Sequence, residues 1–157
     1  GRSDRPASGI LDIPDLLDQA VTLARYSVST DELEVVKEYG HVPAIRANSG
    51  ELLQILVNLV TNAVQAMSGR GRLTLTTAAR QGWITITIRD TGSGISAANL
   101  EKIFTPFFTT KGNKGTGLGL YIVQTLVKKY GGRIRVSSEE GKGSTFTIEF
   151  PEAGSAA

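Results

Sequence analysis

The chain contains no cysteine and only one histidine, His41, in 157 residues. Without cysteine it can form neither disulfides nor thiolate metal sites, and this composition suits a reducing compartment, so we expect a cytoplasmic location. The formal net charge of +2 gives no electrostatic reason to expect a nucleic-acid partner. No apolar run approaches the roughly 20 residues that span a bilayer, and no signal-peptide pattern is present, so we expect this segment not to be inserted in a membrane.

Apolar residues make up 40% of the chain, which is enough for one hydrophobic core in a chain of ordinary domain length. The sequence shows no internal repeat, and we expect a single domain over residues 11–151. Residues 1–10 are interpreted as a cloning remnant and a linker from a domain outside this segment. Residues 152–157 are expected to be a flexible tail.

The spacing of apolar residues predicts helices alternating with strands. Helices are expected over 11–26, 49–67 and 118–130. Strands are expected over 32–39, 43–47, 72–80, 82–90, 133–138 and 144–150. Hairpin-linked strands and helices with one buried face indicate the α+β class, in a two-layer α/β sandwich. Its sheet would be mixed, mostly antiparallel, and covered on one face by helices.

The predicted helix 49–67 carries two asparagines, Asn58 and Asn62, which lie on one face because they are four residues apart. Asparagine is a mediocre helix former, and these two are flanked by leucine and valine. One interpretation is a satisfied polar edge of the core. The other is that their carbonyl oxygens line a site, since oxygen ligands of this kind suit magnesium. Asn48 and Glu51 have the spacing of a capping box at the start of this helix.

Two glycine-rich segments follow. In "RDTGSGI", Asp90 leaves a predicted strand and Gly92 and Gly94 allow a tight bend, so Asp90 could either cap the turn or serve a site. "GTGLGL" lacks the context of a dinucleotide fingerprint and the ending of a P-loop. It does bring backbone amides to a helix start, which attracts phosphate, and Lys111 and Lys114 precede it. Glycine clusters also form ordinary loops.

Taken together and in this order, the motifs resemble the ATP-binding catalytic domain of bacterial sensor histidine kinases, in the superfamily of gyrase, chaperone, histidine kinase and MutL proteins. "LLQILVNLVTNAVQAM" resembles the N box, "DTGSGI" the G1 box, "IFTPFFTTK" the F box and "GTGLGL" the G2 box. The resemblance covers roughly residues 12–151 and implies a Bergerat-type ATP-binding fold. The short distance between the F and G2 boxes is similar to that in short-lid kinases of the nitrogen-regulation and dicarboxylate-sensing types.

The resemblance implies roles for the matching residues. Asn62 matches the magnesium ligand, Asn58 the asparagine that supports metal and phosphates, and Asp90 the carboxylate that accepts a hydrogen bond from the adenine amino group. Asn58 and Asn62 are thus the expected catalytic residues. The expected ATP-binding residues are Asn58, Asn62, Gln65, Asp90, Gly92, Gly94, Ile95, Phe104, Phe107, Phe108, Thr109, Thr110, Lys111, Lys114, Gly115, Thr116, Gly117, Leu118, Gly119 and Leu120. The three phenylalanines match the F box that anchors a mobile lid, expected over 105–116.

Two positions depart from the wider superfamily. Gln65 stands where lysine or arginine is frequent, so a charge contact with the phosphates is missing there. Asn58 stands where the hydrolysing ATPases carry a catalytic glutamate. Without that base to activate water, hydrolysis should be slow and phosphoryl transfer favoured.

The resemblance therefore implies a kinase that uses ATP and Mg²⁺ and transfers the γ-phosphate to a histidine on a separate dimerisation domain. A response regulator would act downstream, the full-length protein could be a membrane-bound sensor with this part in the cytoplasm, and the fragment alone is expected to be a monomer. His41, in "EYGHVPAI", lacks the context of a phosphoacceptor and is interpreted as an incidental turn residue. Two alternatives are a serine-directed kinase similar to anti-sigma-factor kinases, which phosphorylates a separate protein, and a nucleotide-binding scaffold without transfer activity.

Overall fold

The computed structural model describes residues 8–109 and 119–152. In chain order the elements are β1 (Ser8–Leu11), α1 (Ile13–Ala24), β2 (Glu32–Tyr39), β3 (Ile45–Asn48), α2 (Ser49–Ala66), β4 (Arg70–Arg80), β5 (Trp83–Asp90), α3 (Ala97–Leu100), α4 (Gly119–Lys129), β6 (Arg133–Glu139) and β7 (Gly143–Pro151). The helices and strands expected from the apolar pattern are all present, with ends shifted by a few residues.

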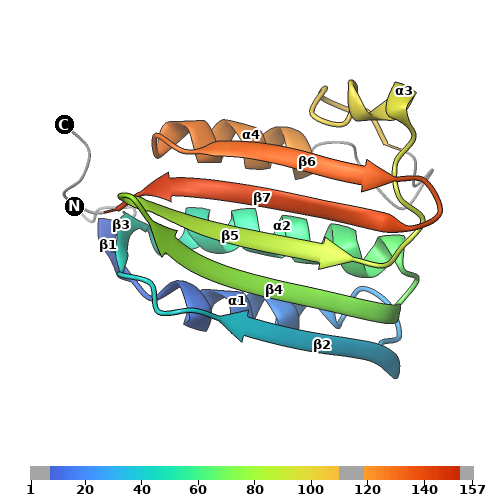
Figure 1. Cartoon of the computed structure of the whole chain (residues 1–157), viewed down its shortest axis with the longest axis horizontal. Coiled ribbons are helices and arrows are strands. Elements are labelled where there is room, and N and C mark those ends of the chain that lie inside the picture. Colours follow the sequence, from blue (N-terminus) through green and yellow to red (C-terminus); the bar gives the residue numbers. More distant parts are fainter. Residues whose placement is uncertain (1–7, 110–118, 153–157) are drawn as a thin grey trace, which may run out of the picture.

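One five-stranded sheet forms a layer of the molecule, in the order β2-β4-β5-β7-β6. Strands β2 and β4 are parallel, and the other neighbours in this sheet are antiparallel. Helices α1, α2 and α4 lie together behind the sheet in Figure 1, so they cover one of its faces. The two-layer sandwich with a mixed, mostly antiparallel sheet is thus confirmed.

The core lies between the sheet and the three longer helices. Along β5, Ile84, Ile86 and Ile88 are fully buried, whereas the intervening threonines face the opposite side of the sheet. Leu52 and Leu56 of α2 are also fully buried against this layer. Each such side chain stabilises the fold by about 1.5–3 kcal/mol through its removal from water, and this burial holds α2 against the sheet.

The pairing of the first strands differs from the sequence-based expectation. Strands 32–39 and 43–47 were expected to flank a turn at Gly40, but they do not pair with each other. Strand β2 pairs with β4, because α2 returns the chain to lie parallel beside it. Strand β3 instead pairs with β1, which the sequence did not predict and which begins inside the segment interpreted as a linker.

The ends of the helices that frame the site follow known capping chemistry. The Asn48 side chain accepts a hydrogen bond from the backbone N–H of Glu51 at 2.8 Å, as the capping-box spacing predicts. Helix α4 ends at Lys129, and Gly131 follows with φ of 74°. The N–H of Gly132 donates to the carbonyl of Val127 at 2.9 Å, which is the closing bond of a Schellman motif. None of the helices within the described ranges is both long and apolar enough to cross a bilayer.

The β4–β5 hairpin generates a stability prediction. Its two-residue turn has φ of 54° at Gln81 and 82° at Gly82, as in a type I′ turn, where an L-residue with a long side chain is disfavoured. Gln81→Asn should therefore raise the free energy of unfolding by about 0.5–1 kcal/mol, because asparagine tolerates the left-handed conformation better. Urea denaturation measures this change. Gln81→Ala is the control and should give no gain; a gain of equal size would contradict the backbone argument.

Candidate functional site

Helix α2 presents a row of three residues toward the site, Asn58, Asn62 and Ala66, spaced four apart and therefore on one face. Both asparagine side chains are half-buried. The Asn58 side-chain amide donates to the backbone carbonyl of Gly119 at 3.5 Å, a long hydrogen bond. The first residue of α4 thus lies against the middle of α2, and the end of the G2 box meets the N box.

The glycine-rich sequence suggests a close approach of other atoms to Gly119, but its contact with Asn58 is not unusually close. A Cβ atom built on it would lie 3.8 Å from Asn58 Cγ, which is an ordinary van der Waals contact. The neighbouring Leu120 is half-buried and packs against the core, so it holds the first turn of α4 in place. Apart from its own helix, only Asn58 among the described residues comes within 4 Å of the Cβ position at Gly119.

Asp90 is the last residue of β5 and is only 3% exposed. Its Oδ1 accepts two backbone hydrogen bonds, from Gly92 at 2.8 Å and from Ser144 at 3.3 Å. No residue that the structure describes donates to Oδ2. Burial raises the pKa of this carboxyl above its ordinary value, and the two hydrogen bonds oppose that rise without cancelling it. One oxygen is thus fixed by the fold, and the other has capacity for an external donor.

The loop after Asp90 is held between α2 and the β6–β7 turn, and its glycines make this possible. A Cβ atom on Gly92 would lie 2.5 Å from the carbonyl oxygen of Ala66, a clash with backbone. Gly94 has φ of 72°, and a Cβ atom there would lie 2.2 Å from the carbonyl oxygen of Glu139. The Ser93 N–H also donates to the Ala66 carbonyl at 3.2 Å. Any larger residue at either glycine would displace the loop that follows Asp90.

Three motifs far apart in the sequence therefore meet along one row of α2. The start of α4 touches Asn58, the loop after Asp90 touches Ala66, and Asn62 lies one turn from each of these contacts. The sequence predicted that these motifs would share a site. Gln65 is half-buried on the same helix, and Ile95 is half-buried in the loop.

Two serines that complete the site were not among the expected site residues. The Ser138 hydroxyl accepts a hydrogen bond from the Ile95 N–H at 2.8 Å and lies 2.8 Å from the hydroxyl of Ser144. Ser144 in turn donates its backbone N–H to Asp90. Only the pairing of strands could have indicated that they belong to the site, because β7 pairs with β5 and places Ser144 opposite Asp90. The sequence also missed Met67, whose buried sulfur accepts a hydrogen bond from the Thr91 N–H at 3.4 Å.

The three phenylalanines of the F box do not act alike. Phe104 and Phe108 are half-buried and pack against the core, as expected of anchors. Phe107 is 73% exposed and has φ of 70°, so it does not anchor this segment. The match of the three residues to an F box that anchors a lid stays a prediction, and Phe104 and Phe108 are the two that contact the core.

Only some of the remaining residues expected at the site belong to the described residues. Thr109 is half-buried at the end of the first described range. Seven expected ligand residues lie outside the described residues, namely Thr110, Lys111, Lys114, Gly115, Thr116, Gly117 and Leu118, together with most of the segment expected to form a lid.

The side chains at the site fit magnesium only in the company of a phosphate ligand. Within the two described ranges, no group of three or more histidine, aspartate or glutamate residues could hold a metal ion alone. The Asn62 side chain makes no hydrogen bond with any described residue, so its carbonyl oxygen has free capacity. Mg²⁺ is characteristically held by one or two protein oxygens together with substrate phosphates and water, which this arrangement allows.

Comparison with known proteins agrees with this geometry. Residues 47–154 match a family model described as histidine kinase-, DNA gyrase B-, and HSP90-like ATPase. The sensor histidine kinase ZraS of Escherichia coli K12 is 39% identical over 142 residues, which cover 90% of this chain and 30% of ZraS. The sensor kinase CckA of Brucella abortus is 41% identical over 160 residues, which cover 90% of this chain and 17% of CckA. The chain thus spans less than a third of the length of these relatives.

Solved structures give the same result. The crystal structure of full-length ShkA in complex with AMPPNP matches with a TM-score of 0.83 and 33% identity, over 99% of this chain and 33% of ShkA. The nucleotide-free catalytic domain of the histidine kinase ThkA matches with a TM-score of 0.81 and 28% identity, over 93% of this chain and 96% of that domain. The family match covers most of the residues that build the site, and the fold agrees with histidine kinase catalytic domains. The chain belongs to the histidine kinase-, DNA gyrase B-, and HSP90-like ATPase family, as a domain of the sensor histidine kinase type.

Proposed function

We propose that this chain is the ATP-binding catalytic domain of a two-component sensor histidine kinase and presents the γ-phosphate of ATP to a histidine on a separate dimerisation domain. The observation that carries the proposal is Asp90, a buried carboxylate with one oxygen fixed by two backbone N–H groups and the other without a donor among the described residues. Asp90 lies beside the asparagine row of α2 through the contact of its loop with Ala66. This pairing of a base-reading carboxylate with phosphate-binding groups suits an adenine nucleotide.

Asp90 would bind the base. A hydrogen bond from the adenine amino group to Oδ2 would favour the charged form of the carboxyl and so offset part of the cost of its burial. Because Gly92 and Gly94 hold the loop against fixed backbone on both sides, Oδ2 is presented without reorganisation when the ligand arrives.

Asn58, Asn62 and the start of α4 would bind the phosphates. The N–H groups and the dipole at a helix N-terminus favour negative charge, and the described part of α4 begins at Gly119, beside Asn58. The carbonyl oxygen of Asn62 would hold Mg²⁺, which neutralises charge on the phosphates when bound. Transfer breaks the bond between the γ-phosphorus and the β-phosphate bridging oxygen, releases ADP and forms a phosphorus–nitrogen bond on the acceptor.

Transfer to a partner is favoured over hydrolysis because of the residue at position 58. An asparagine amide cannot take a proton from an attacking water, so this position lacks the base that hydrolysis needs. His41 is a poor acceptor within this chain, since it is exposed in the connection after β2, and β2 points in the opposite direction to β5, which ends at Asp90 (Figure 1). We therefore infer that the acceptor histidine lies on another domain of a longer cytoplasmic or membrane-bound sensor, with a response regulator downstream.

Phosphoryl transfer tests the proposal directly. The chain is mixed with γ-labelled ATP, Mg²⁺ and a dimerisation domain that carries the acceptor histidine, taken from the same full-length protein. Acid-labile, base-stable label on that domain is expected, because phosphohistidine has this lability. Acid-stable label on a separate protein would favour the serine-directed alternative, and ATP binding without any transfer would favour a scaffold.

Asp90→Asn should weaken ATP binding, because Oδ2 is replaced by an amide that cannot accept from the adenine amino group as a charged oxygen does. Loss of a hydrogen bond to a charged group is worth about 1.5–3 kcal/mol, which is roughly tenfold to a hundredfold in the dissociation constant. Isothermal titration calorimetry measures it. Unchanged ATP affinity would contradict the role of Asp90.

The same variant should be more stable than the wild type at pH 7. Because the pKa of Asp90 is raised in the folded state, the folded protein binds this proton more tightly than the unfolded chain does. Wild-type stability therefore falls as the pH rises above the ordinary carboxyl value of 3.8. Asp90→Asn lacks this penalty, so its advantage should shrink as the pH is lowered toward that value. Urea denaturation at several pH values tests this, and an advantage independent of pH would refute it.

Asn62→Ala should remove the dependence of ATP binding on magnesium. The wild type is expected to bind ATP more weakly in EDTA than with Mg²⁺, whereas the variant should bind equally in both, because the protein oxygen that holds the ion is gone. Gln54→Ala, an exposed amide on the same helix, is the control and should keep the wild-type difference. A magnesium effect that survives in Asn62→Ala would exclude this residue as the ligand.

A further inference from the structure

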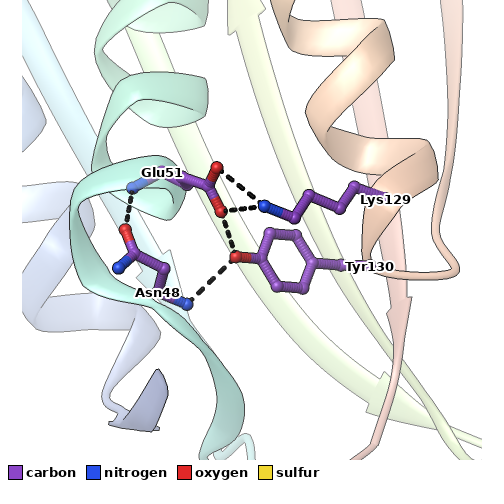
Figure 2. A network of polar contacts seen from close by, with 4 residues as sticks. All are labelled: Asn48, Glu51, Lys129 and Tyr130. Carbon is purple, nitrogen blue, oxygen red and sulfur yellow. Dashed lines mark hydrogen bonds and ion pairs between the residues drawn. The ribbon is translucent and has the colours of Figure 1, made fainter. Parts of the chain in front are cut away.

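Four residues join the start of α2 to the end of α4 (Figure 2). The Tyr130 hydroxyl donates to a carboxylate oxygen of Glu51 in a short hydrogen bond and accepts from the backbone N–H of Asn48 at 3.1 Å. Lys129 Nζ lies 2.9 Å from each oxygen of the same carboxylate. We call Glu51, Lys129 and Tyr130 the clasp.

The clasp replaces half of an ordinary capping box. In that motif the glutamate side chain returns to the N–H of the capping residue, but here the Tyr130 hydroxyl stands between Glu51 and Asn48. Asn48 is only 8% exposed, so its N–H needs this partner. The cap of α2 is therefore complete only when the end of α4 is in place, although 82 residues separate Asn48 from Tyr130.

The three side chains of the clasp favour one set of protonation states at neutral pH. The hydrogen bonds from Tyr130 and Lys129 lower the pKa of Glu51. Burial, followed by the bond to Glu51, raises the pKa of Tyr130, and the bond to Glu51 raises that of Lys129. The carboxylate, the neutral phenol and the ammonium thus favour one another, so the contact persists around pH 7.

The clasp and the candidate phosphate site lie at opposite ends of α4. Helix α4 runs antiparallel to α2, from the contact of Gly119 with Asn58 to the clasp at Lys129 and Tyr130 (Figure 1). A helix of 11 residues is a rigid rod about 16 Å long, so fixing its end also limits where its start can lie. At its start, the described contacts of α4 are the packing of Leu120 against the core and the long bond of 3.5 Å at Asn58, so its close polar contacts with α2 are those of the clasp.

We propose that the clasp is a positioning device, in which Tyr130 and Lys129 on Glu51 fix α4 along α2 and so place the start of α4 for the phosphates of ATP. The inference rests on the proposed function, because it assigns the start of α4 to phosphate binding. It concerns the phosphate end of the site, since the hydrogen bonds that hold the loop after Asp90 within the described residues go to α2, β6 and the β6–β7 turn.

The chain contains a matched control for this chemistry. The Tyr39 hydroxyl donates to Asp18 at 2.9 Å, and Lys37 Nζ lies 2.8 Å from the same carboxylate. This second tyrosine–carboxylate–lysine group joins β2 to α1 and contains no residue of α4. Tyr39→Phe therefore removes an equivalent hydroxyl without altering the placement of α4.

The test compares the affinities for ATP with Mg²⁺ and for adenosine, which carries the base without phosphates. Tyr130→Phe should weaken ATP binding about threefold to tenfold, the worth of a net hydrogen bond or slightly more, and leave adenosine affinity unchanged. Tyr39→Phe should leave the ratio of the two affinities at the wild-type value, even where thermal unfolding shows that both variants lose similar stability. Lys129→Met keeps the aliphatic stem of an exposed side chain, so it folds securely and should lower the ATP-to-adenosine ratio in the same direction.

The possible outcomes separate the two proposals. If wild type, Tyr130→Phe and Lys129→Met share one ratio of ATP to adenosine affinity, the clasp has no positioning role and the inference is overturned. If Tyr39→Phe lowers the ratio as much as Tyr130→Phe, the effect is a general loss of stability, which also overturns it. If the wild type binds neither ligand, the proposed function fails first and the clasp inference fails with it.

Discussion

The site depends on the close approach of the loop after Asp90 to the backbone at the end of α2. Gly92 lies so near the Ala66 carbonyl that a single added carbon would clash, and the Ser93 N–H bonds the same carbonyl. This contact fixes the buried carboxylate relative to the asparagine row of α2, so the groups proposed to bind the base and the phosphates are held by the same helix. Helix α2 is itself fixed by fully buried leucines, which means that the hydrophobic core ultimately sets the geometry of the polar groups.

The site has a firm end and a more adjustable end. Around Asp90 the chain is bonded from three directions, by Gly92, by Ser144 and by the Ser138 contact with Ile95. At the start of α4 one long hydrogen bond links Asn58 to Gly119, and the stronger attachment of that helix lies at its far end. This division agrees with the proposed function, because movement at the phosphate end would assist transfer to a separate partner.

Local patterns predicted most of the fold, and pairing between distant strands accounts for most of what they missed. The alternation in 82–90 and the apolar stripe in 49–67 reflect which face of each element is buried, so the spacing of apolar residues was sufficient to predict this strand and this helix. Strand β1 has only four residues and exists through its pairing with β3, which no local pattern encodes. The order of the motifs predicted that Asp90, Asn58 and Asn62 share a site. The places of Ser138 and Ser144 could be known only from the register of β5, β6 and β7. The positive φ of Phe107 could not be predicted from the F box, because a sequence motif does not specify backbone angles.

The bond between Asp90 and Ser144 joins residues 54 positions apart, and it ties assembly of the site to the last strand of the sheet. Closing so long a loop is slow compared with forming a helix or a hairpin, so this contact belongs among the late events of folding. During synthesis, α2 and β5 leave the ribosome well before β7, and in that interval the carboxylate lacks its partner Ser144. Under the proposed function, a nascent chain would therefore gain its contact with adenine only after the final strand has been translated and inserted between β5 and β6.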